Sequence, residues 1–226
     1  MPVILRVGID DAPPIPMQIG SPETGDFRGF EVDVLEQIAK RLSLALHYHR
    51  AFWSVIVREL AAGNLDIVCS AATITEERTR EVDFCVPHLR QALATVKRAG
   101  IPSGLPLSAL RLGVRAGTTA ETYARDRGVT QFAQVSESNE ELYAALASGA
   151  FDAIIDDSPI ARHFSRAHSQ LRFGDILPDS QGAYAIMVRK GEDALRERIN
   201  IVLNDMERDG TLRDLRQKWF RGERLT

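Results

Sequence analysis

The 226-residue sequence is poor in cysteine and histidine, lacks long apolar runs and has little excess of either charge. Its 28 basic and 31 acidic residues give a formal net charge of −3, so composition gives no sign of a nucleic-acid-binding or polybasic membrane surface. No stretch approaches the roughly 20 apolar residues that a transmembrane helix needs. The hydrophobic content of 44% and charged content of 26% are instead ordinary for a globular protein with one large domain or two lobes.

The two cysteines, Cys69 and Cys85, lie in apolar stretches 16 positions apart. Two thiols without a cluster of histidines make a poor metal site, and the 5 histidines have no metal-ligand spacing beyond what chance supplies. We expect buried free thiols, with a disulfide as the alternative if the two stretches are neighbours in the fold. Accordingly, no metal ligand and no cofactor are expected.

Short β-branched stretches alternate with helical patterns along the whole chain. This alternation predicts α/β architecture with largely parallel sheets. The clearest helix covers Phe30–Leu42, where apolar residues recur at helical spacing and acidic residues occupy the first turn. The pattern also predicts strands over residues 5–9, 44–49 and 184–188, and helices over residues 55–62, 193–206 and 212–220.

Two motifs of the first half recur in the second half in the same order. Leu5-Arg-Val-Gly-Ile matches Leu110-Arg-Leu-Gly-Val, and Leu60-Ala-Ala-Gly-Asn-Leu-Asp-Ile-Val matches Leu146-Ala-Ser-Gly-Ala-Phe-Asp-Ala-Ile. Each half therefore contains a strand, and later a helix that ends near glycine before a strand that starts at aspartate. The repeat predicts two lobes. Because ligands of open α/β sheets bind beyond the carboxyl ends of the strands, two such lobes facing each other would form a cleft.

The stretch from Ser70 to Phe84 follows an apolar strand and is rich in small and hydroxylated residues before an arginine. Backbone N–H groups, hydroxyls and a guanidinium at one strand end are the components of an anion site. The alternative is a helix that is N-capped by Thr75 and carries Arg78 on a solvated face, in a surface ion pair with Glu77 or Glu81.

Polar residues follow the predicted strands in both halves of the chain. They are Asp10, Asp11, Ser70, Thr73 and Arg78 in the first half, and Gly117, Thr118, Thr119, Asp156 and Asp157 in the second.

A fixed positive charge thus occurs in the first half and a carboxylate pair in the second, which suits a zwitterionic ligand. Arg78 can hold a carboxylate in a bidentate fork, and Asp157 can accept hydrogen bonds from an ammonium group. The alternative for Asp157 is the N-cap of a helix that starts at Ser158. Nothing in the sequence marks any of these carboxylates as having a perturbed pKa.

Several motifs together resemble the solute-binding proteins of polar-amino-acid ABC importers, bacterial extracellular solute-binding protein family 3. The resemblance extends from about Leu5 to Phe220. Its motifs are Gly29-Phe-Glu-Val-Asp-Val, Trp53-Ser-Val-Ile-Val-Arg-Glu-Leu-Ala-Ala-Gly-Asn-Leu-Asp, Thr73-Ile-Thr-Glu-Glu-Arg78 with Val82-Asp-Phe, Gly117-Thr-Thr-Ala-Glu, Asp152-Ala-Ile-Ile-Asp-Asp157, and Gly210-Thr-Leu through Lys218-Trp-Phe.

The resemblance implies the type II periplasmic-binding fold, with two Rossmann-like α/β lobes joined by two crossover strands and a ligand cleft between them. Lobe 1 would be discontinuous and comprise residues 1–92 and 187–226. Lobe 2 would comprise residues 93–186. The crossover strands would lie near residues 92–97 and 183–188.

The resemblance also implies roles for the residues at the strand ends. Arg78 and Thr73, with Thr119, would bind an α-carboxylate, and Asp157 would bind an α-ammonium group. Ser70 and Ala71 would offer backbone groups. Trp53 would stack on the ligand side chain, with burial in the core as the alternative. The complete expected set is Asp10, Asp11, Trp53, Ser70, Ala71, Thr73, Arg78, Gly117, Thr118, Thr119 and Asp157.

By the same resemblance, the protein would be a monomeric, non-enzymatic, periplasmic protein that closes around an amino acid and delivers it to an ABC permease, with no nucleic-acid partner. The first residues read as a strand and not as a signal peptide, so we expect any export signal to have been removed. The alternatives are a ligand-sensing domain of a membrane receptor or kinase, and a cyclohexadienyl-dehydratase-like enzyme on the same fold.

The chain departs from the family pattern at two places. Ala12 stands where the family usually has an aromatic residue, so one wall of an aromatic clamp is missing. Phe84-Cys-Val-Pro-His stands where the family often has Phe-Ser-Asp-Pro-Tyr. These departures leave the side-chain specificity open, although Asp10 and Asp11 favour a basic or polar ligand side chain.

Overall fold

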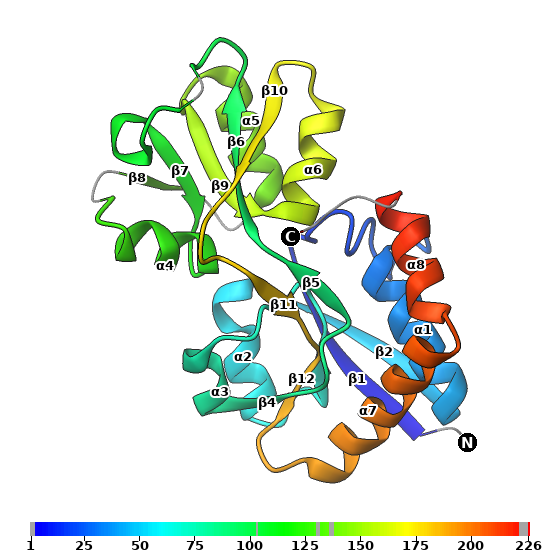
Figure 1. Ribbon diagram of the computed structural model, residues 1–226. Helices are drawn as coiled ribbons and strands as arrows, with labels where there is room; N and C mark the ends of the chain where they lie inside the picture. Colours follow the sequence, from blue (N-terminus) through cyan, green and yellow to red (C-terminus); the bar gives the residue numbers. More distant parts are fainter. Residues whose placement is uncertain (1–2, 103, 130–131, 136–137, 222–225) are drawn as a thin grey trace. The chain divides into compact units, whose positions relative to one another are not determined.

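The structure is a computed structural model that describes residues 3–102, 104–129, 132–135, 138–221 and 226. The chain forms two compact units, which Figure 1 shows with their helices and strands. Unit 1 comprises Met1–Arg90 and Gly182–Arg224, and unit 2 comprises Gln91–Gln181 and Leu225–Thr226. The helices within the described residues are all too short or too polar to cross a membrane.

Unit 1 is built on a five-stranded sheet with the order β2-β1-β3-β12-β4. The central strands are apolar and buried, as Val7, Ile67 and Met187 illustrate, because helices cover them. β1 runs parallel to β2 and β3, whereas β12 runs antiparallel to β3 and β4. The strands are β1 (Val3–Asp10), β2 (Leu44–Ala51), β3 (Ile67–Val68), β4 (Val82–Phe84) and β12 (Met187–Arg189).

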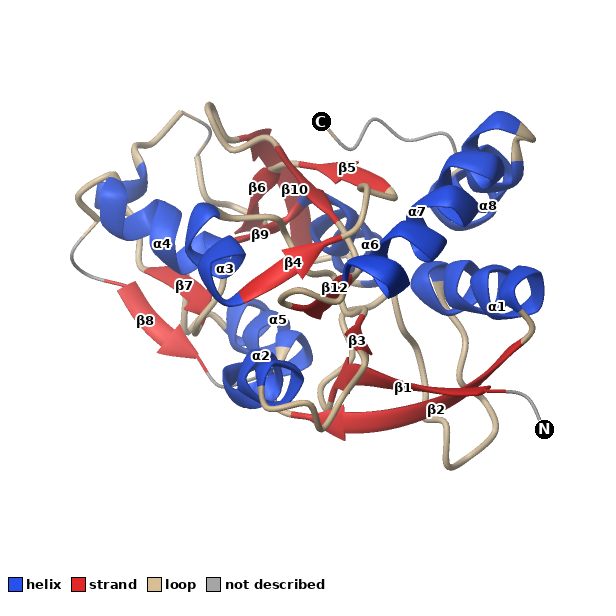
Figure 2. Ribbon diagram, turned by 90° about the horizontal axis from the view of Figure 1, so that it is seen from below, coloured by secondary structure: helices blue, strands red, loops and turns tan. Residues whose placement is uncertain are grey.

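Three helices of unit 1 pack on one another, as Figures 1 and 2 show: α1 (Phe30–Leu42), α7 (Asp193–Arg208) and α8 (Thr211–Phe220). The predicted limits of α1 are confirmed, and this helix starts directly after Gly29, where any side chain would collide with the carbonyl oxygen of Met17. α2 (Trp53–Ala61) packs against the sheet, and the short α3 (Glu76–Glu81) leads into β4.

Unit 2 has its own five-stranded sheet, with the order β10-β6-β9-β7-β8. β7 runs parallel to β8 and β9, and β6 runs antiparallel to β9 and β10. The strands are β6 (Leu93–Arg98), β7 (Leu112–Arg115), β8 (Phe132–Val135), β9 (Ala153–Asp157) and β10 (Leu171–Ile176). The helices that pack on them are α4 (Thr119–Asp126), α5 (Asn139–Ser148) and α6 (Ser158–Ala167), and a 3₁₀ turn covers Leu107–Ala109.

The chain passes from one unit to the other at two places, next to β5 (Leu89–Gln91) and β11 (Gly182–Tyr184), which form a separate two-stranded sheet. The predicted strand over residues 184–188 is therefore wrong as one strand. It is divided into β11 and β12, which belong to different sheets, because Ala185 donates its N–H to Ala72 O and Ile186 O accepts from Cys85 N between them.

The expected lobe boundaries fell after residues 92 and 186, whereas the compact units divide after Arg90 and Gln181. Residues 182–186 pack with unit 1 through the backbone bonds just described and through the bridge between Thr73 and Tyr184. Residues 1–2 and 222–225 of the expected lobe 1 lie outside the described residues. Each sheet is also only partly parallel, because its antiparallel strands come from the chain segments near the crossings.

The sequence repeat corresponds to the same construction in both units. In unit 1, Arg6 donates to Asp66 from its backbone N at 2.7 Å and from Nη2 at 2.6 Å. In unit 2, Arg111 donates to Asp152 from its backbone N at 3.1 Å and from Nη2 at 2.7 Å. Arg6 lies within β1 and Arg111 directly precedes β7, and each is tied to the aspartate that precedes the parallel neighbour of that strand. The predicted duplication is thus confirmed at the level of individual hydrogen bonds.

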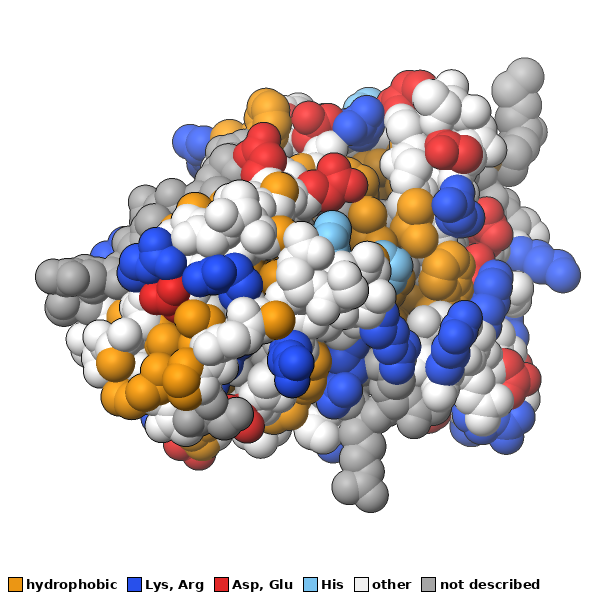
Figure 3. Space-filling model, turned by 90° about the horizontal axis from the view of Figure 1, so that it is seen from above, with side chains coloured by type: hydrophobic (Ala, Val, Ile, Leu, Met, Phe, Trp, Pro, Cys, Tyr) orange, Lys and Arg blue, Asp and Glu red, His pale blue; other side chains and the backbone are white. Residues whose placement is uncertain are grey.

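Charged groups of both signs share the face shown in Figure 3 with uncharged and apolar side chains. This mixture agrees with the small formal charge of −3.

Candidate ligand-binding site

Arg78 contacts two other predicted site residues of unit 1, Thr73 and Trp53. It lies in α3, where Thr75 Oγ1 accepts a hydrogen bond from Arg78 N at 3.2 Å, so the predicted N-cap at Thr75 is confirmed. Its Nη1 donates to Thr73 O at 2.8 Å, and its Cζ lies 4.7 Å from the centre of the Trp53 ring. The structure therefore brings Trp53, Thr73 and Arg78 together. The segment 73–78 both caps α3 and positions the guanidinium of Arg78.

The contacts of Thr73 and Trp53 restrict where the guanidinium can lie. Thr73 is buried, and its backbone is paired with Tyr184 in an antiparallel bridge. Trp53 begins α2 and packs its side chain against the apolar core of unit 1, so the core role considered for it is also correct. A guanidinium held between a fixed carbonyl and an aromatic ring is preorganised, which lowers the entropic cost of binding an anion in a bidentate fork.

Ser70 and Ala71, which follow β3, form hydrogen bonds inside unit 1. The buried Ser70 hydroxyl accepts from Asp10 N at 3.1 Å and donates to Gln18 Oε1 at 3.2 Å. Ala71 has a φ of 50° and donates its N–H to Glu31 Oε2 at 2.8 Å. These bonds hold the loop that leads to Thr73 in one conformation, and they already use the Ser70 hydroxyl and the Ala71 N–H.

Asp10 and Asp11 at the end of β1 have different surroundings. Asp10 is buried and accepts a hydrogen bond from Ala12 N at 3.2 Å. Asp11 is half-exposed and forms an ion pair with Arg50, whose Nε lies 3.0 Å from Asp11 Oδ1. The charge of Asp11, which the sequence suggested would favour a basic ligand, is thus compensated within the protein.

Gly117, Thr118 and Thr119 of unit 2 form the turn from β7 into α4. Gly117 has a φ of 69° and donates its N–H to Glu121 Oε2 at 2.8 Å. Thr118 is the N-cap residue of α4 and donates its hydroxyl to Arg115 O at 2.7 Å, and Thr119 begins the helix. Because the first N–H groups of a helix have no partner within the helix, Thr119 stands where an anion is favoured.

Asp157 ends β9 and occupies the N-cap position of α6, as the alternative interpretation predicted, but its side chain makes no capping hydrogen bond. Its backbone N donates to the carboxylate of its neighbour, Asp156 Oδ1, at 2.8 Å. Asp157 therefore occupies the N-cap position of α6, but its carboxylate does not cap the helix.

Asp156 is a titratable residue whose character the sequence did not indicate. Burial, followed by the neighbouring charge of Asp157, raises its pKa to about 7. Burial, followed by the charge of Asp156, also raises the pKa of the phenol of Tyr143. The expectation that no carboxylate here has a perturbed pKa is wrong, because Asp156 lies in a strand that is buried on both faces.

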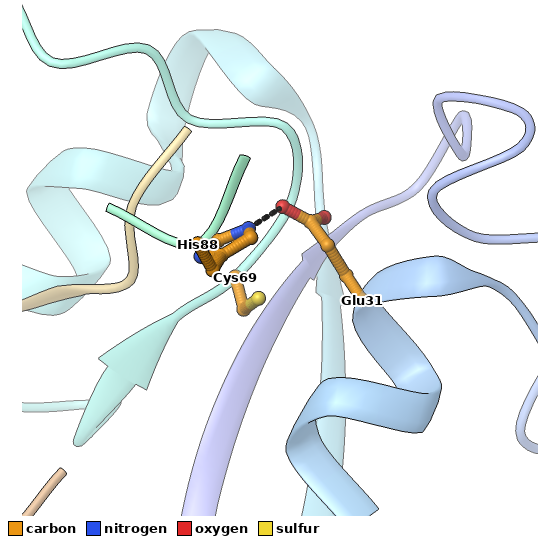
Figure 4. Close-up of side chains that lie close together, drawn as sticks. All are labelled: Glu31, Cys69 and His88. Carbon is orange, nitrogen blue, oxygen red and sulfur yellow. Dashed lines mark hydrogen bonds and ion pairs between the residues drawn. The ribbon is translucent and has the colours of Figure 1, made fainter. Parts of the chain in front are cut away.

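A further cluster in unit 1 joins Glu31, Cys69 and His88, all of them buried (Figure 4). His88 Nε2 lies 3.0 Å from Glu31 Oε1. Cys69 and Cys85 are free thiols, which confirms the first interpretation of the cysteines. However, the inference from the sequence that no histidine accompanies them is wrong for Cys69. Sequence spacing could not show this, because the three residues come from α1, the end of β3 and the segment after β4.

The fold and the polar strand ends define a class: a binding protein made of two α/β units, with one part of the predicted site in each. The chain belongs to the bacterial extracellular solute-binding proteins, family 3, whose family model matches residues 5–222. The type II fold and the solute-binding role that the sequence predicted are confirmed by this membership and by the structural neighbours. Members of the family act outside the cytoplasm.

Individual proteins show the same similarity. The L-cystine-binding protein TcyJ of Escherichia coli K12 is 26% identical, over 96% of this chain and 82% of TcyJ. A solved structure of an ancestral arginine-binding protein bound to glutamine is 32% identical with a TM-score of 0.87, covering 99% of this chain and 100% of that one. The ancestral amino acid-binding protein AncCDT-1, a precursor of cyclohexadienyl dehydratase, is 28% identical with a TM-score of 0.86, covering 96% of this chain and 95% of that one.

Proposed function

We propose that this protein binds the α-carboxylate and α-ammonium groups of an amino acid and delivers that amino acid to an ABC importer. The observation that carries the proposal is the position of Arg78, whose guanidinium is held by Thr73 O at 2.8 Å and by the Trp53 ring at 4.7 Å. The similar proteins described above are named for cystine and arginine, and one of them holds glutamine. These molecules share the two α-substituents but not their side chains.

In this proposal, Arg78, Thr73 and Thr119 bind the carboxylate, and Asp157 binds the ammonium group. Charged hydrogen bonds contribute roughly 1.5–3 kcal/mol each, so four or five give roughly 6–15 kcal/mol, a range that includes the roughly 8 kcal/mol of micromolar binding. Trp53 supports Arg78 and stacks on the ligand side chain. The remaining residues, Asp10, Asp11, Ser70, Ala71, Gly117 and Thr118, shape the loops around these groups.

The proposal also covers the location, the oligomeric state and the partner of the protein. It works in the periplasm as a monomer, and its partner is a membrane permease and not a nucleic acid. A receptor or kinase domain of the same fold would bind the same ligand but would be encoded on one chain with its signalling domain. The gene neighbourhood, a permease and an ATPase on one hand or a kinase on the other, separates these two possibilities.

The decisive experiment compares Arg78→Ala with Arg80→Ala. Arg80 lies in the same helix, is exposed and pairs with Glu76 at 2.8 Å, so it is a matched control for loss of a positive charge. Amino acids are first screened by thermal shift, and the Kd of the strongest ligand is then measured by calorimetry. We expect Arg78→Ala to weaken binding by at least roughly 100-fold, because about 3 kcal/mol of charged hydrogen bonding is lost, and Arg80→Ala to leave the Kd unchanged.

Two results would contradict the proposal. One is an absence of stabilisation by every compound that carries an α-carboxylate. The other is an equal loss of affinity in both arginine variants. The melting temperature of ligand-free Arg78→Ala is expected to stay close to that of the wild type. A collapse of folding in this variant would assign Arg78 a structural role instead.

An enzymatic function is the second candidate, and Asp156 is the observation that favours testing it. A carboxyl group with a pKa of about 7 can donate a proton near neutral pH, which is what a general acid requires. We nevertheless propose a binding protein without catalytic activity, because Asp156 is only 8% exposed. Turnover of prephenate or arogenate by the purified protein, lost in Asp156→Asn, would establish the enzyme.

A further inference from the structure

The interior of unit 1 contains three side chains of metal-ligating type that belong to separate segments. Glu31 is in the first turn of α1, Cys69 follows β3, and His88 precedes β5. One donor atom from each of the three lies within 4.8 Å of the other two. Figure 4 shows the carboxylate, thiol and imidazole pointing toward one another.

These donors match one class of ion. Carboxylate oxygen, imidazole nitrogen and thiolate sulfur are the ligands of Zn²⁺ and of similar divalent metals, at roughly 2.0–2.3 Å from the ion. Around a tetrahedral ion such donors are roughly 3.5 Å apart, so donors already within 4.8 Å of one another need only small movements to share an ion. A divalent cation with a carboxylate, a thiolate and a neutral imidazole has no net charge, which suits a site from which water is excluded.

The hydrogen bonds around the cluster leave the imidazole available as a ligand. Glu31 is held by two bonds, one from Ala71 N at 2.8 Å and one between Oε1 and His88 Nε2 at 3.0 Å. The other ring nitrogen, His88 Nδ1, is buried and has no hydrogen-bond partner among the residues that the structure describes. A neutral imidazole carries its proton on either nitrogen, so the ring can present a lone pair to an ion while staying uncharged.

The backbone around the cluster is also fixed. The carbonyl of His88 accepts from Arg216 Nη2 at 2.9 Å. The carbonyl of Cys69 accepts from the side-chain amide of Gln18 at 2.5 Å. Outer contacts of this kind orient ligands before an ion arrives, as they do in metal sites generally.

From this geometry we propose that Glu31, Cys69 and His88 bind one divalent ion of the zinc class inside unit 1. Binding exchanges the proton of the Cys69 thiol for the ion. The proton of the thiol is released to solvent when the Cys69 sulfur becomes a ligand, and no redox change occurs. The affinity therefore rises with pH.

The ion would join α1, the end of β3 and the segment before β5, and it would act as a structural link. Through Glu31 it would also fix the N–H of Ala71, two residues before Thr73. This role does not depend on the amino-acid ligand proposed above, because each metal ligand belongs to the interior of unit 1.

The experiment uses the 226-residue chain. Co²⁺ serves as a spectroscopic substitute for Zn²⁺. The background is His47→Ala, because His47 and His49 form an exposed pair with ring nitrogens 2.9 Å apart that could bind metal at the surface. Since the cluster is buried, the protein is loaded both by incubation in the folded state and by refolding with Co²⁺. We expect one equivalent of Co²⁺ with a thiolate-to-metal charge-transfer absorption band, and a rise in Tm of several degrees with Zn²⁺.

Cys69→Ser is expected to abolish the absorption band, and Cys85→Ser, a second buried thiol, is the matched control that should retain it. His88→Gln, which keeps a polar side chain, is expected to weaken Co²⁺ binding by at least tenfold. The proposal is overturned if neither loading route produces the band, if the band survives in Cys69→Ser, or if Cys85→Ser abolishes it. Should Cys69→Ser fail to fold, the band of the parent protein and the His88→Gln titration still decide the question.

Discussion

Asp156 and Asp157 are adjacent in the sequence, yet their carboxyl groups have different surroundings. Asp156 points into unit 2 with 8% of its surface exposed, near Tyr143, whereas Asp157 is half-buried at the start of α6. Asp156 lies in the buried part of β9, whereas Asp157 is its last residue and the N-cap residue of α6, which explains the difference. A pair that looks like one double charge in the sequence is therefore one buried carboxyl group and one half-buried carboxylate.

This difference predicts a pH-dependent effect of Asp156→Asn. The pKa of about 7 in the folded state is above the unfolded value near 3.8, so the folded protein binds more protons between these pH values. The stability of the wild type therefore falls as pH rises from about 4 to 7. We expect the stability of Asp156→Asn relative to the wild type to be greater at pH 8 than at pH 5, as measured by guanidinium unfolding.

The same variant can contradict this interpretation. An equal shift in unfolding free energy at both pH values would mean that Asp156 acts through packing and not through its charge. Asp157→Asn provides the comparison, because it removes the neighbouring charge that helps to raise the pKa of Asp156 and is therefore expected to lessen the pH dependence of stability.

At the scale of helices and strands, the repeated Arg–Asp pairs show how each unit fixes its sheet. Asp66 accepts from both the backbone and the guanidinium of Arg6, and Asp152 does the same with Arg111. The bonds from Arg6 outweigh burial and lower the pKa of Asp66, and the bonds from Arg111 lower the pKa of Asp152. The two carboxylates therefore hold strand starts together while both are ionised.

This arrangement predicts unequal effects for the two partners. Asp152→Ala is expected to reduce the free energy of unfolding by about 1 kcal/mol, because it leaves both the guanidinium and the backbone N–H of Arg111 without their acceptor. Arg111→Ala is expected to cost less, since an exposed ion pair contributes roughly 0.2–1 kcal/mol. Denaturant unfolding at pH 7 measures both changes, and Asp66→Ala tests the equivalent pair in unit 1.

The pH dependence provides the control for these variants. Because the pKa of Asp152 is lowered by folding, its contribution is present above the unfolded pKa near 3.8 and is lost as pH falls through the folded value. The Asp152→Ala difference should therefore shrink in strong acid. A difference that stays constant down to pH 2 would mean that the effect comes from lost packing.

For the whole molecule, the division into two compact units with two chain crossings determines how ligand binding would be observed. Arg78 and Thr73 belong to unit 1, and Thr119 and Asp157 belong to unit 2. A ligand that binds all four of these residues, as proposed above, must contact both units. Binding energy that links two units also suppresses local opening in each of them.

Hydrogen exchange tests this expectation directly. With saturating amino acid, we expect slower amide exchange both in residues 70–78 and in residues 117–119 and 156–158. Arg78→Ala should lose the protection in both units at the same ligand concentration. Protection confined to unit 1 would show that Asp157 takes no part, and it would contradict the proposed pairing of carboxylate and ammonium sites.

The sequence by itself determined the α/β class, the duplicated motifs, the limits of α1, the cap at Thr75 and the family. These follow from local periodicity, helix-end chemistry and motif order, which need no knowledge of distant contacts. Only the tertiary structure decided that Arg78 lies over Trp53, that the segment 184–188 is divided between two sheets, and that Asp156 is buried. It also decided that Glu31, Cys69 and His88 meet, because neighbours in space are brought together by the crossing of strands and helices far apart in the chain.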